Sequence, residues 1–106
     1  MLTWNEFQYY YKLKYGPTPK KVMSYAYTIY KLRNSHVEIF YKPECIYCQK
    51  AKELLNHYRI PYTAYDVHNK HHYDMMLKRS HGRKTVPQIF INHKHLGGYD
   101  DLSKIL

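Results

Sequence analysis

The sequence of 106 residues contains only two cysteines, Cys45 and Cys48, so it cannot form the disulfide framework of a small secreted domain. It has no apolar run near the roughly 20 residues that a membrane-spanning helix requires, and its N-terminus lacks the apolar core of a signal peptide. Four glycines and five prolines are too few for a collagen-like chain, and 44% of apolar residues is too many for a disordered one. These absences predict one small domain in the cytoplasm.

Acidic residues are also few, with 8 Asp and Glu against 17 Lys and Arg, which gives a net charge of +9. The excess is strongest in residues 1–35, where Glu6 is the one acidic residue. Such a segment can attract nucleic acid, anionic lipid or an acidic protein through long-range electrostatics, or it can be a solvated helix face. We expect the solvated face, with neither nucleic acid nor a membrane as partner, in a protein that is a monomer.

Residues 1–35 predict two helices separated by a break. A capping-box pattern opens the first helix, a glycine and two prolines interrupt the chain, and apolar side chains recur at helical spacing in the second. The expected elements are a helix over 3–15 capped by Thr3 with Glu6, a break at 16–19, and a helix from Thr18 or Pro19 to Arg33 with Val22, Ala26 and Ile29 on its apolar face.

Residues 36–106 alternate short apolar segments with amphipathic ones, which is typical of an α/β sheet. Because two strands follow one another at the end, we expect a mixed four-stranded sheet flanked by helices. Ile46, Leu54 and Leu55 are expected on the inner face of the first helix, and Ala64 in a buried second strand. The predicted strands are 37–41, 61–67, 88–91 and one at Leu96 after a turn at 92–94, and the predicted helices are 45–58, 69–80 and 100–106.

The segment Cys45-Ile46-Tyr47-Cys48 directly follows the first strand and opens a helix. Free main-chain N–H groups and the positive end of the helix dipole favour the thiolate form of Cys45, and Cys48 lies one turn further on the same face. The first thiolate can therefore attack a disulfide, and the second thiol can resolve the mixed disulfide that results. Lys42 adds a positive charge near the pair and Glu44 a negative one.

Two other interpretations of the cysteine pair are a zinc site and a pair of inert buried thiols. Zinc would need His68 and His72, but the 19 residues between the two pairs exceed the usual zinc-finger spacing. Inert thiols would not need to stand at a helix start. Most of the histidines are expected to be solvated, and none is needed for thiol chemistry.

Thr85-Val86-Pro87 precedes the third strand, where a cis X–Pro bond is expected. A cis turn exposes the main-chain N–H and C=O of Val86, with which a peptide-like ligand can pair as an added strand. In the following segment, 97–101, main-chain amides can hold a ligand carboxylate and Asp100 a ligand ammonium group. The alternative is that its acidic residues only cap the last helix.

These three motifs (Cys-x-Tyr-Cys, Thr-Val-Pro and Gly-Gly-Tyr-Asp-Asp-Leu) occur in the order and spacing of glutaredoxins, so residues 36–106 resemble that family. The resemblance implies a thioredoxin-like fold and glutathione-dependent reduction of protein disulfides and glutathione mixed disulfides, with glutathione as cosubstrate and no metal. It also implies a set of functional residues: Cys45 as nucleophile, Cys48 as resolving thiol, and Lys42, Tyr47, Thr85, Val86, Pro87, Gly98, Tyr99 and Asp100 as the glutathione-binding residues.

The chain departs from the family at two points. Ile46 stands where dithiol members usually have proline, which leaves the redox potential open, and residues 1–35 have no counterpart in minimal members. We divide the chain into an N-terminal helical extension, 1–35, and a glutaredoxin domain, 36–106. The extension is expected to supply contacts that a short terminal helix lacks, and a docking arm is the alternative.

Two further functions are compatible with the same residues. A glutaredoxin-like dimer can hold an iron–sulfur cluster through Cys45 and glutathione, which would make the protein a binding module. A dedicated electron donor, serving a reductase such as ribonucleotide reductase, is the second alternative.

Overall fold

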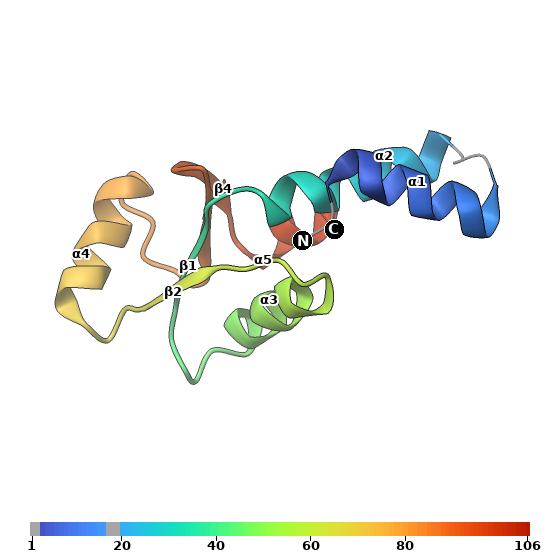
Figure 1. Cartoon of the computed structure of the whole chain (residues 1–106). Helices are drawn as coiled ribbons and strands as arrows, with labels where there is room; N and C mark the ends of the chain where they lie inside the picture. The colour runs from blue at the N-terminus through green and yellow to red at the C-terminus, as the bar shows by residue number, and fades with distance from the viewer. Residues whose placement is uncertain (1–2, 17–19) are drawn as a thin grey trace.

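Two helices precede a four-stranded sheet with three further helices in the computed structural model, which describes residues 3–16 and 20–106 (Figure 1). In chain order the elements are α1 Trp4–Tyr15, α2 Lys20–Arg33, β1 Val37–Tyr41, α3 Ile46–His57, β2 Thr63–Asp66, α4 Lys70–Arg79, β3 Gln88–Ile91, β4 Lys94–Gly97 and α5 Tyr99–Ile105.

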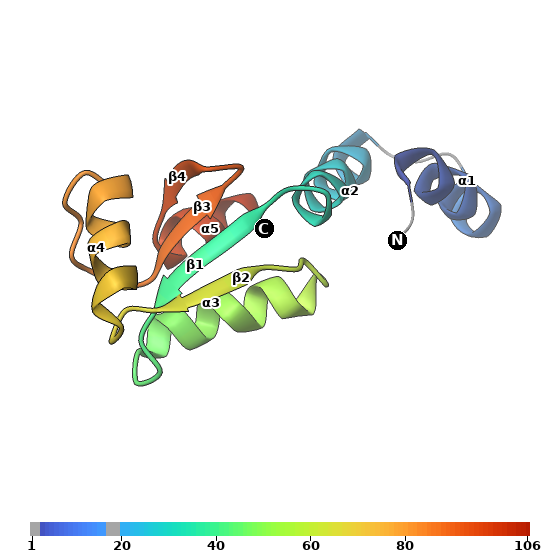
Figure 2. The same cartoon turned by 60° about the vertical axis from the view of Figure 1, so that its left-hand side comes forward.

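The sheet has the strand order β2-β1-β3-β4, which Figure 2 shows with β1 between β2 and β3. β1 pairs with β2 in parallel and with β3 antiparallel, and β3 pairs antiparallel with β4. The mixed four-stranded sheet predicted from the sequence is therefore confirmed.

Helices cover both faces of the sheet, with α4 on one side and α3 and α5 on the other (Figure 1). Successive residues of a strand point to opposite faces, so neighbouring apolar residues of β1 and β3 enter different clusters. Two buried clusters result, and burial of their apolar side chains is the main stabilising contribution to the fold. The first contains Ile39, Ile89, Ala51, Leu55 and Leu102, and the second contains Phe40, Phe90, Val67 and Met76.

A buried carboxylate joins α4 to the sheet. Glu38 in β1 is 3% exposed, and Arg79 at the end of α4 donates to its two oxygens at 2.7 and 2.9 Å. The hydroxyl of Tyr65 donates to the same carboxylate at 3.2 Å. The hydrogen bonds from Arg79 lower the pKa of Glu38 against the opposing effect of its burial. A charge in this position needs such partners, because an unpaired buried carboxylate is strongly destabilising.

Two expectations about burial are wrong. Ile46 is 66% exposed, because the buried face of α3 consists of Cys48, Ala51 and Leu55, and a residue two positions before Cys48 lies roughly 200° around the helix. Ala64 is exposed in β2, an edge strand that covers 63–66 and not 61–67.

The N-terminal helices begin as the sequence predicts where the structure describes them. The Thr3 side chain accepts the main-chain N–H of Glu6 at 3.1 Å and caps α1. The predicted start of the second helix at Thr18 or Pro19 lies outside the described residues, as does the side chain of Val22. No helix within 3–16 and 20–106 combines the length and apolar character needed to cross a membrane.

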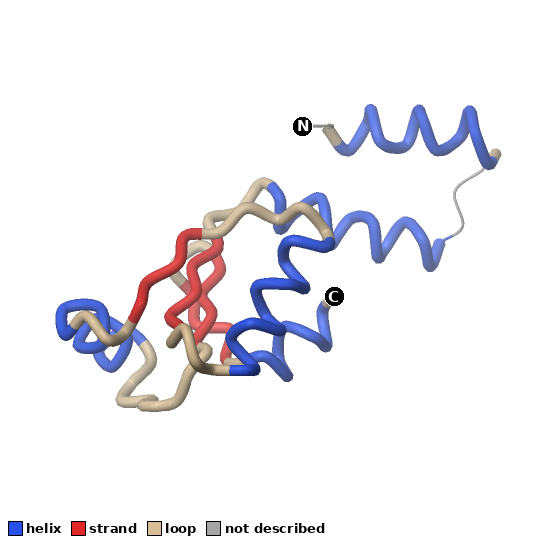
Figure 3. Tube along the Cα trace, turned by 90° about the horizontal axis from the view of Figure 1, so that it is seen from below, coloured by secondary structure: helices blue, strands red, loops and turns tan. Residues whose placement is uncertain are grey.

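The last turn of α2 belongs to the core, whereas α1 lies away from the sheet and runs opposite to α2 (Figure 3). Leu32 is 5% exposed within the cluster beneath α3 and α5. Arg33 donates to the main-chain oxygen of Tyr58 at 2.9 Å, and the Tyr25 hydroxyl donates to the main-chain oxygen of Leu106 at the same distance. The division of the chain at residues 35 and 36 stays a prediction.

Replacing Leu32 by Ala is expected to lower the free energy of unfolding by about 2–5 kcal/mol, because it leaves a cavity in the core. The matched control is Leu13→Ala on α1, where Leu13 is 68% exposed and the change should stay within about 0.5 kcal/mol. Urea denaturation of the full chain measures both values. Equal effects of the two substitutions would contradict the core position of Leu32.

Candidate active site

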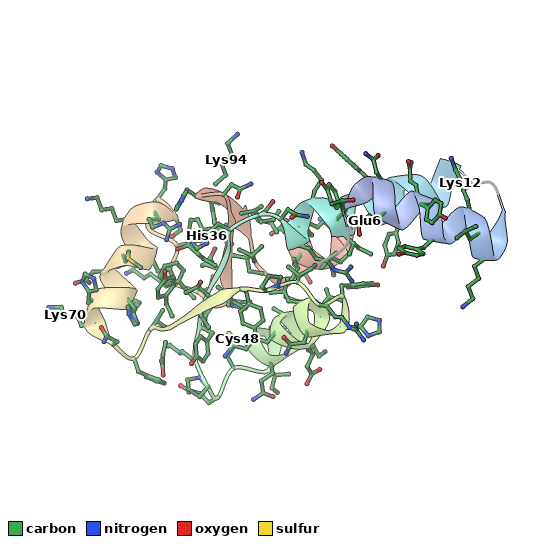
Figure 4. All side chains as sticks on the ribbon, in the orientation of Figure 1. Glu6, Lys12, His36, Cys48, Lys70 and Lys94 are labelled. Carbon is green, nitrogen blue, oxygen red and sulfur yellow. The ribbon has the colours of Figure 1, made fainter. Side chains whose placement is uncertain are left out.

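The cysteine pair stands where β1 leads into α3, and Figure 4 shows Cys48 near the start of that helix. The main-chain N–H of Cys45 donates to the Lys42 carbonyl at 3.1 Å, which closes a turn between strand and helix. The Gln49 side chain donates to the Pro43 carbonyl, also at 3.1 Å, and holds the loop from the helix side. The loop conformation therefore fixes where Cys45 lies.

Cys45 is the N-cap residue of α3, and its sulfur replaces the side-chain oxygen that usually caps a helix. The main-chain N–H of Cys48 donates to this sulfur at 3.2 Å. Cys45 is half-buried, and its Sγ lies 3.7 Å from the carbonyl oxygen of Val86. The Cys45 sulfur thus lies at the start of the helix, with a main-chain N–H directed at it.

Cys48 has a different environment, because only 1% of it is exposed. Burial raises the pKa of the Cys48 thiol to about 12, and its interaction with Cys45 acts in the same direction. One turn further along α3, burial lowers the pKa of Lys52, whose ammonium lies 3.1 Å from the ring centre of Tyr41. The two thiols therefore have different environments: Cys45 is half-buried, whereas Cys48 is buried and stays protonated near neutral pH.

The charge of Glu44 beside Cys45 has a partner that the sequence did not indicate. The His68 ring nitrogen lies 2.9 Å from one carboxylate oxygen and 3.0 Å from the other. The hydrogen bond lowers the pKa of Glu44 and raises that of His68. When His68 is protonated, the pair reduces the negative charge next to Cys45.

A cavity of about 360 Å³ opens next to the cysteine pair, between Tyr47 at the start of α3, the segment before β3 and the start of α5. The Val86–Pro87 bond is cis, as the sequence predicts. The rings of Tyr47 and Tyr99 stand 6.0 Å apart, centre to centre. The cavity is within the size range of small-ligand sites, and its lining residues are Tyr47, Arg83, Thr85, Val86, Pro87, Gln88, Gly98, Tyr99, Asp100 and Asp101.

The two adjacent acids at the start of α5 have different roles. The Asp101 carboxylate accepts the main-chain N–H of Gly98 at 3.1 Å and therefore caps the helix. Asp100 is exposed on the wall of the cavity. Gly97 has φ +129° and touches the Asp101 carboxylate, so a side chain at position 97 would be strained and would clash. The sequence left open which acid is the cap, and the structure assigns it to Asp101.

Most residues that the sequence places at the ligand site line this cavity, with Lys42 as the exception. Lys42 is half-buried in the loop before Cys45. Three lining residues were not among the predicted ligand contacts: Arg83, Gln88 and Asp101. Gln88 and Asp101 adjoin predicted residues in the sequence, and the basic pair Arg83-Lys84 just before Thr85 was expected only to attract an anionic ligand.

In the part of the chain that the structure describes, no group of three or more His, Cys, Asp or Glu side chains is arranged to hold a metal ion. His68 is paired with Glu44, and the His72 ring nitrogen lies 3.0 Å from the Asp66 carbonyl oxygen. The histidines of the zinc alternative thus have other partners.

Two cysteines one turn apart at a helix start, next to a mixed four-stranded sheet, are the arrangement of a thiol–disulfide oxidoreductase, and the comparisons with known proteins support this class for the chain. The chain belongs to the glutaredoxin family, whose family model matches residues 37–96. Glutaredoxin 3 of Escherichia coli K12 is 45% identical over 69 residues, which cover 64% of this chain and 82% of that protein. Glutaredoxin 1 of Rickettsia prowazekii is 43% identical over 70 residues, covering 63% and 74%.

Solved structures agree with this assignment. The solution structure of glutaredoxin from Brucella melitensis is 38% identical, with a TM-score of 0.56, and the match covers 66% of this chain and 76% of that one. The buckwheat glutaredoxin–glutathione complex has a TM-score of 0.58 over 83% of this chain and 84% of that one. At 24% identity, the buckwheat structure shows the shared fold alone.

In a Cys45→Ser variant, alkylation of Cys48 by iodoacetamide is expected to be slow near about pH 7 and to rise about tenfold per pH unit up to about pH 9, because only the thiolate reacts. The reason is that burial, the largest cause of the raised pKa of the Cys48 thiol, remains when Cys45 is replaced. Mass spectrometry of the labelled protein gives the rate. A rate that levels off near the ordinary cysteine pKa of about 8.5 would contradict the buried environment.

Proposed function

We propose that this protein reduces protein disulfides and glutathione mixed disulfides, with glutathione as the reductant, Cys45 as nucleophile and Cys48 as resolving thiol. The observation that carries the proposal is the cavity that Tyr47 and Val86 line next to Cys45, whose Sγ lies 3.7 Å from the Val86 carbonyl oxygen. We expect a peptide-like ligand to bind there with its sulfur toward the thiol. Such an enzyme needs a reducing compartment, and we place it in the cytoplasm, where a glutathione pool keeps the cysteine pair reduced.

The walls of the cavity suit the groups of the tripeptide. The main chain of Val86 can pair with the cysteinyl backbone as an added strand. Asp100 can bind the ammonium group of the γ-glutamyl end, and Arg83 a carboxylate. Tyr47 and Tyr99 bracket the apolar part of the ligand. Lys42, although outside the lining, adds positive charge that attracts an anionic ligand.

The reaction begins when the Cys45 thiolate attacks the glutathione sulfur of a mixed disulfide. The substrate S–S bond breaks, a bond between Cys45 and glutathione forms, and the released substrate thiolate takes a proton from solvent. A second glutathione thiolate then attacks the bound glutathione sulfur, which releases oxidised glutathione and restores the Cys45 thiolate. One molecule of free glutathione is consumed for each mixed disulfide reduced, because the other half of the oxidised glutathione comes from the substrate.

Protein disulfides need the second cysteine. After Cys45 has formed a mixed disulfide with the substrate protein, Cys48 loses its proton and attacks the Cys45 sulfur, which releases the reduced substrate. Because its pKa is raised, the Cys48 thiol stays protonated and unreactive until a disulfide lies next to it. The nearby ammonium of Lys52 stabilises the thiolate that forms in this step. Two glutathione molecules then reduce the Cys45–Cys48 disulfide.

A coupled assay tests the proposal directly. NADPH consumption is followed with glutathione, glutathione reductase and a small glutathione mixed disulfide, for the intact protein and for Cys45→Ser and Cys48→Ser. We expect turnover with the intact protein, none with Cys45→Ser, and partial turnover with Cys48→Ser, because the mixed-disulfide route needs only the first thiol. Absence of turnover from folded, reduced protein, together with visible absorption of an iron–sulfur cluster, would replace the proposal by the cluster-binding alternative.

The adjacent acids of α5 give a matched pair of variants. Asp100→Ala is expected to raise the KM for glutathione about tenfold, a loss of about 1.4 kcal/mol of binding, with little change in melting temperature. Asp101→Ala should instead lower the stability by about 1 kcal/mol, because the helix loses its cap. Kinetics and thermal melts of both variants decide the matter. An unchanged KM in Asp100→Ala would remove that residue from the site.

A further inference from the structure

Gln88 is a fully buried polar residue at the edge of the candidate active site. It follows the cis Val86–Pro87 bond, opens β3 and has 0% exposure. A buried side-chain amide is costly unless its donors and acceptor are satisfied. The partners of Gln88 therefore show what its position requires.

The amide of Gln88 connects two segments of the chain. Its Nε2 donates to the Thr85 carbonyl oxygen at 2.9 Å and to the Thr85 hydroxyl oxygen at 3.2 Å. Its Oε1 lies 2.6 Å from the Nε2 of His95. Because the amide oxygen can only accept, His95 must carry its hydrogen on Nε2. The chain of hydrogen bonds runs from His95 through Gln88 to Thr85.

His95 is itself held in place by β4 and β3. Phe90 and His95 are paired across the two strands, and their ring centres are 5.0 Å apart. Burial is the largest cause of the lowered pKa of His95, and the positive charges of Arg83 and His81 lower it further. The ring is therefore neutral near neutral pH, and the half-buried site holds a hydrogen-bond donor without a charge.

Thr85 is the residue that this arrangement fixes. It is exposed and lies outside the strands, directly before Val86, and both residues line the cavity. The Val86 carbonyl oxygen is 3.7 Å from the Cys45 sulfur, so a small shift of this segment changes the distance between ligand and thiol. Displacements of about 1 Å can reduce catalysis a hundredfold.

We propose that Gln88 and His95 are positioning residues, which hold Thr85 and Val86 in the conformation that binds the ligand next to Cys45. Gln88 holds the segment before β3 through its hydrogen bonds to Thr85, and His95 orients the Gln88 amide so that its N–H groups face Thr85. Neither residue contacts the reacting sulfur atoms. The inference rests on the proposed function, since it assigns these residues to the same ligand site.

The experiment compares His95→Leu, which removes the donor, with His95→Gln, whose side-chain amide places a donor near the position of Nε2. Gln88→Leu removes the centre of the chain. Lys94→Ala is the control on the same strand, since Lys94 is exposed and points into solvent (Figure 4). Two measurements are made on each full-length variant: the coupled glutathione assay, and ¹⁵N relaxation of the Thr85 and Val86 amides.

We expect His95→Leu and Gln88→Leu to raise the KM for the glutathione mixed disulfide at least about tenfold, with a smaller change in kcat. Backbone order parameters at Thr85 and Val86 should fall from about 0.85 to below about 0.6. His95→Gln should restore both quantities, and Lys94→Ala should leave both unchanged. If Gln88→Leu does not fold, the two His95 variants still give the comparison.

Lower melting temperatures with unchanged KM and unchanged order parameters would overturn the inference, because they would show a purely structural role. The same holds if His95→Leu and His95→Gln behave alike. If the intact protein has no glutathione-dependent turnover, the proposed function fails, whereas the relaxation data still decide whether His95 and Gln88 hold the loop.

Discussion

The antiparallel pairing of β1 with β3 is the constraint on which the site depends. Phe40 near the end of β1 stands opposite Gln88 at the start of β3. The chain that leaves β1 toward Cys45 and the chain that enters β3 from Val86 therefore meet where these strands end and begin, on one side of the sheet. Since β4 runs antiparallel to β3, the last residue of β4 leads into α5 on that same side. Three loops remote in sequence thus form one cavity.

The fold places two chemically identical side chains, those of Cys45 and Cys48, in different environments. Cys45 caps a helix at the protein surface, whereas Cys48 faces the interior one turn later. A free N–H group acts on the first sulfur, and lack of solvent acts on the second. The proposed order of events in thiol–disulfide exchange is thus consistent with the position of each cysteine on α3.

Local sequence signals were sufficient for much of this structure. The strand and helix order, the mixed sheet, the Thr3 cap and the cis Val86–Pro87 bond each depend on a few neighbouring residues, and each was predicted. Ile46 was misplaced because apolar character alone does not tell on which side of a helix start a residue lies.

Interactions between distant segments could not be predicted in the same way. The Glu44–His68 pair joins two loops, and the His95–Gln88 hydrogen bond depends on the pairing of β3 with β4, which contains an irregularity between Ile89 and Phe90. Such contacts follow from register, which a single sequence does not display. Most residues that line the cavity could be predicted, because they belong to three sequence motifs that together indicated one ligand site.

The burial of Leu32 has a consequence for how this sequence can change over time. The last turn of α2 contributes to the same core as α3 and α5, whereas the large apolar side chains described on α1, such as Tyr9 and Leu13, are exposed. Exposed positions of α1 such as Tyr9 and Leu13 can therefore accept more substitutions than Leu32, which must change together with the core residues that it contacts.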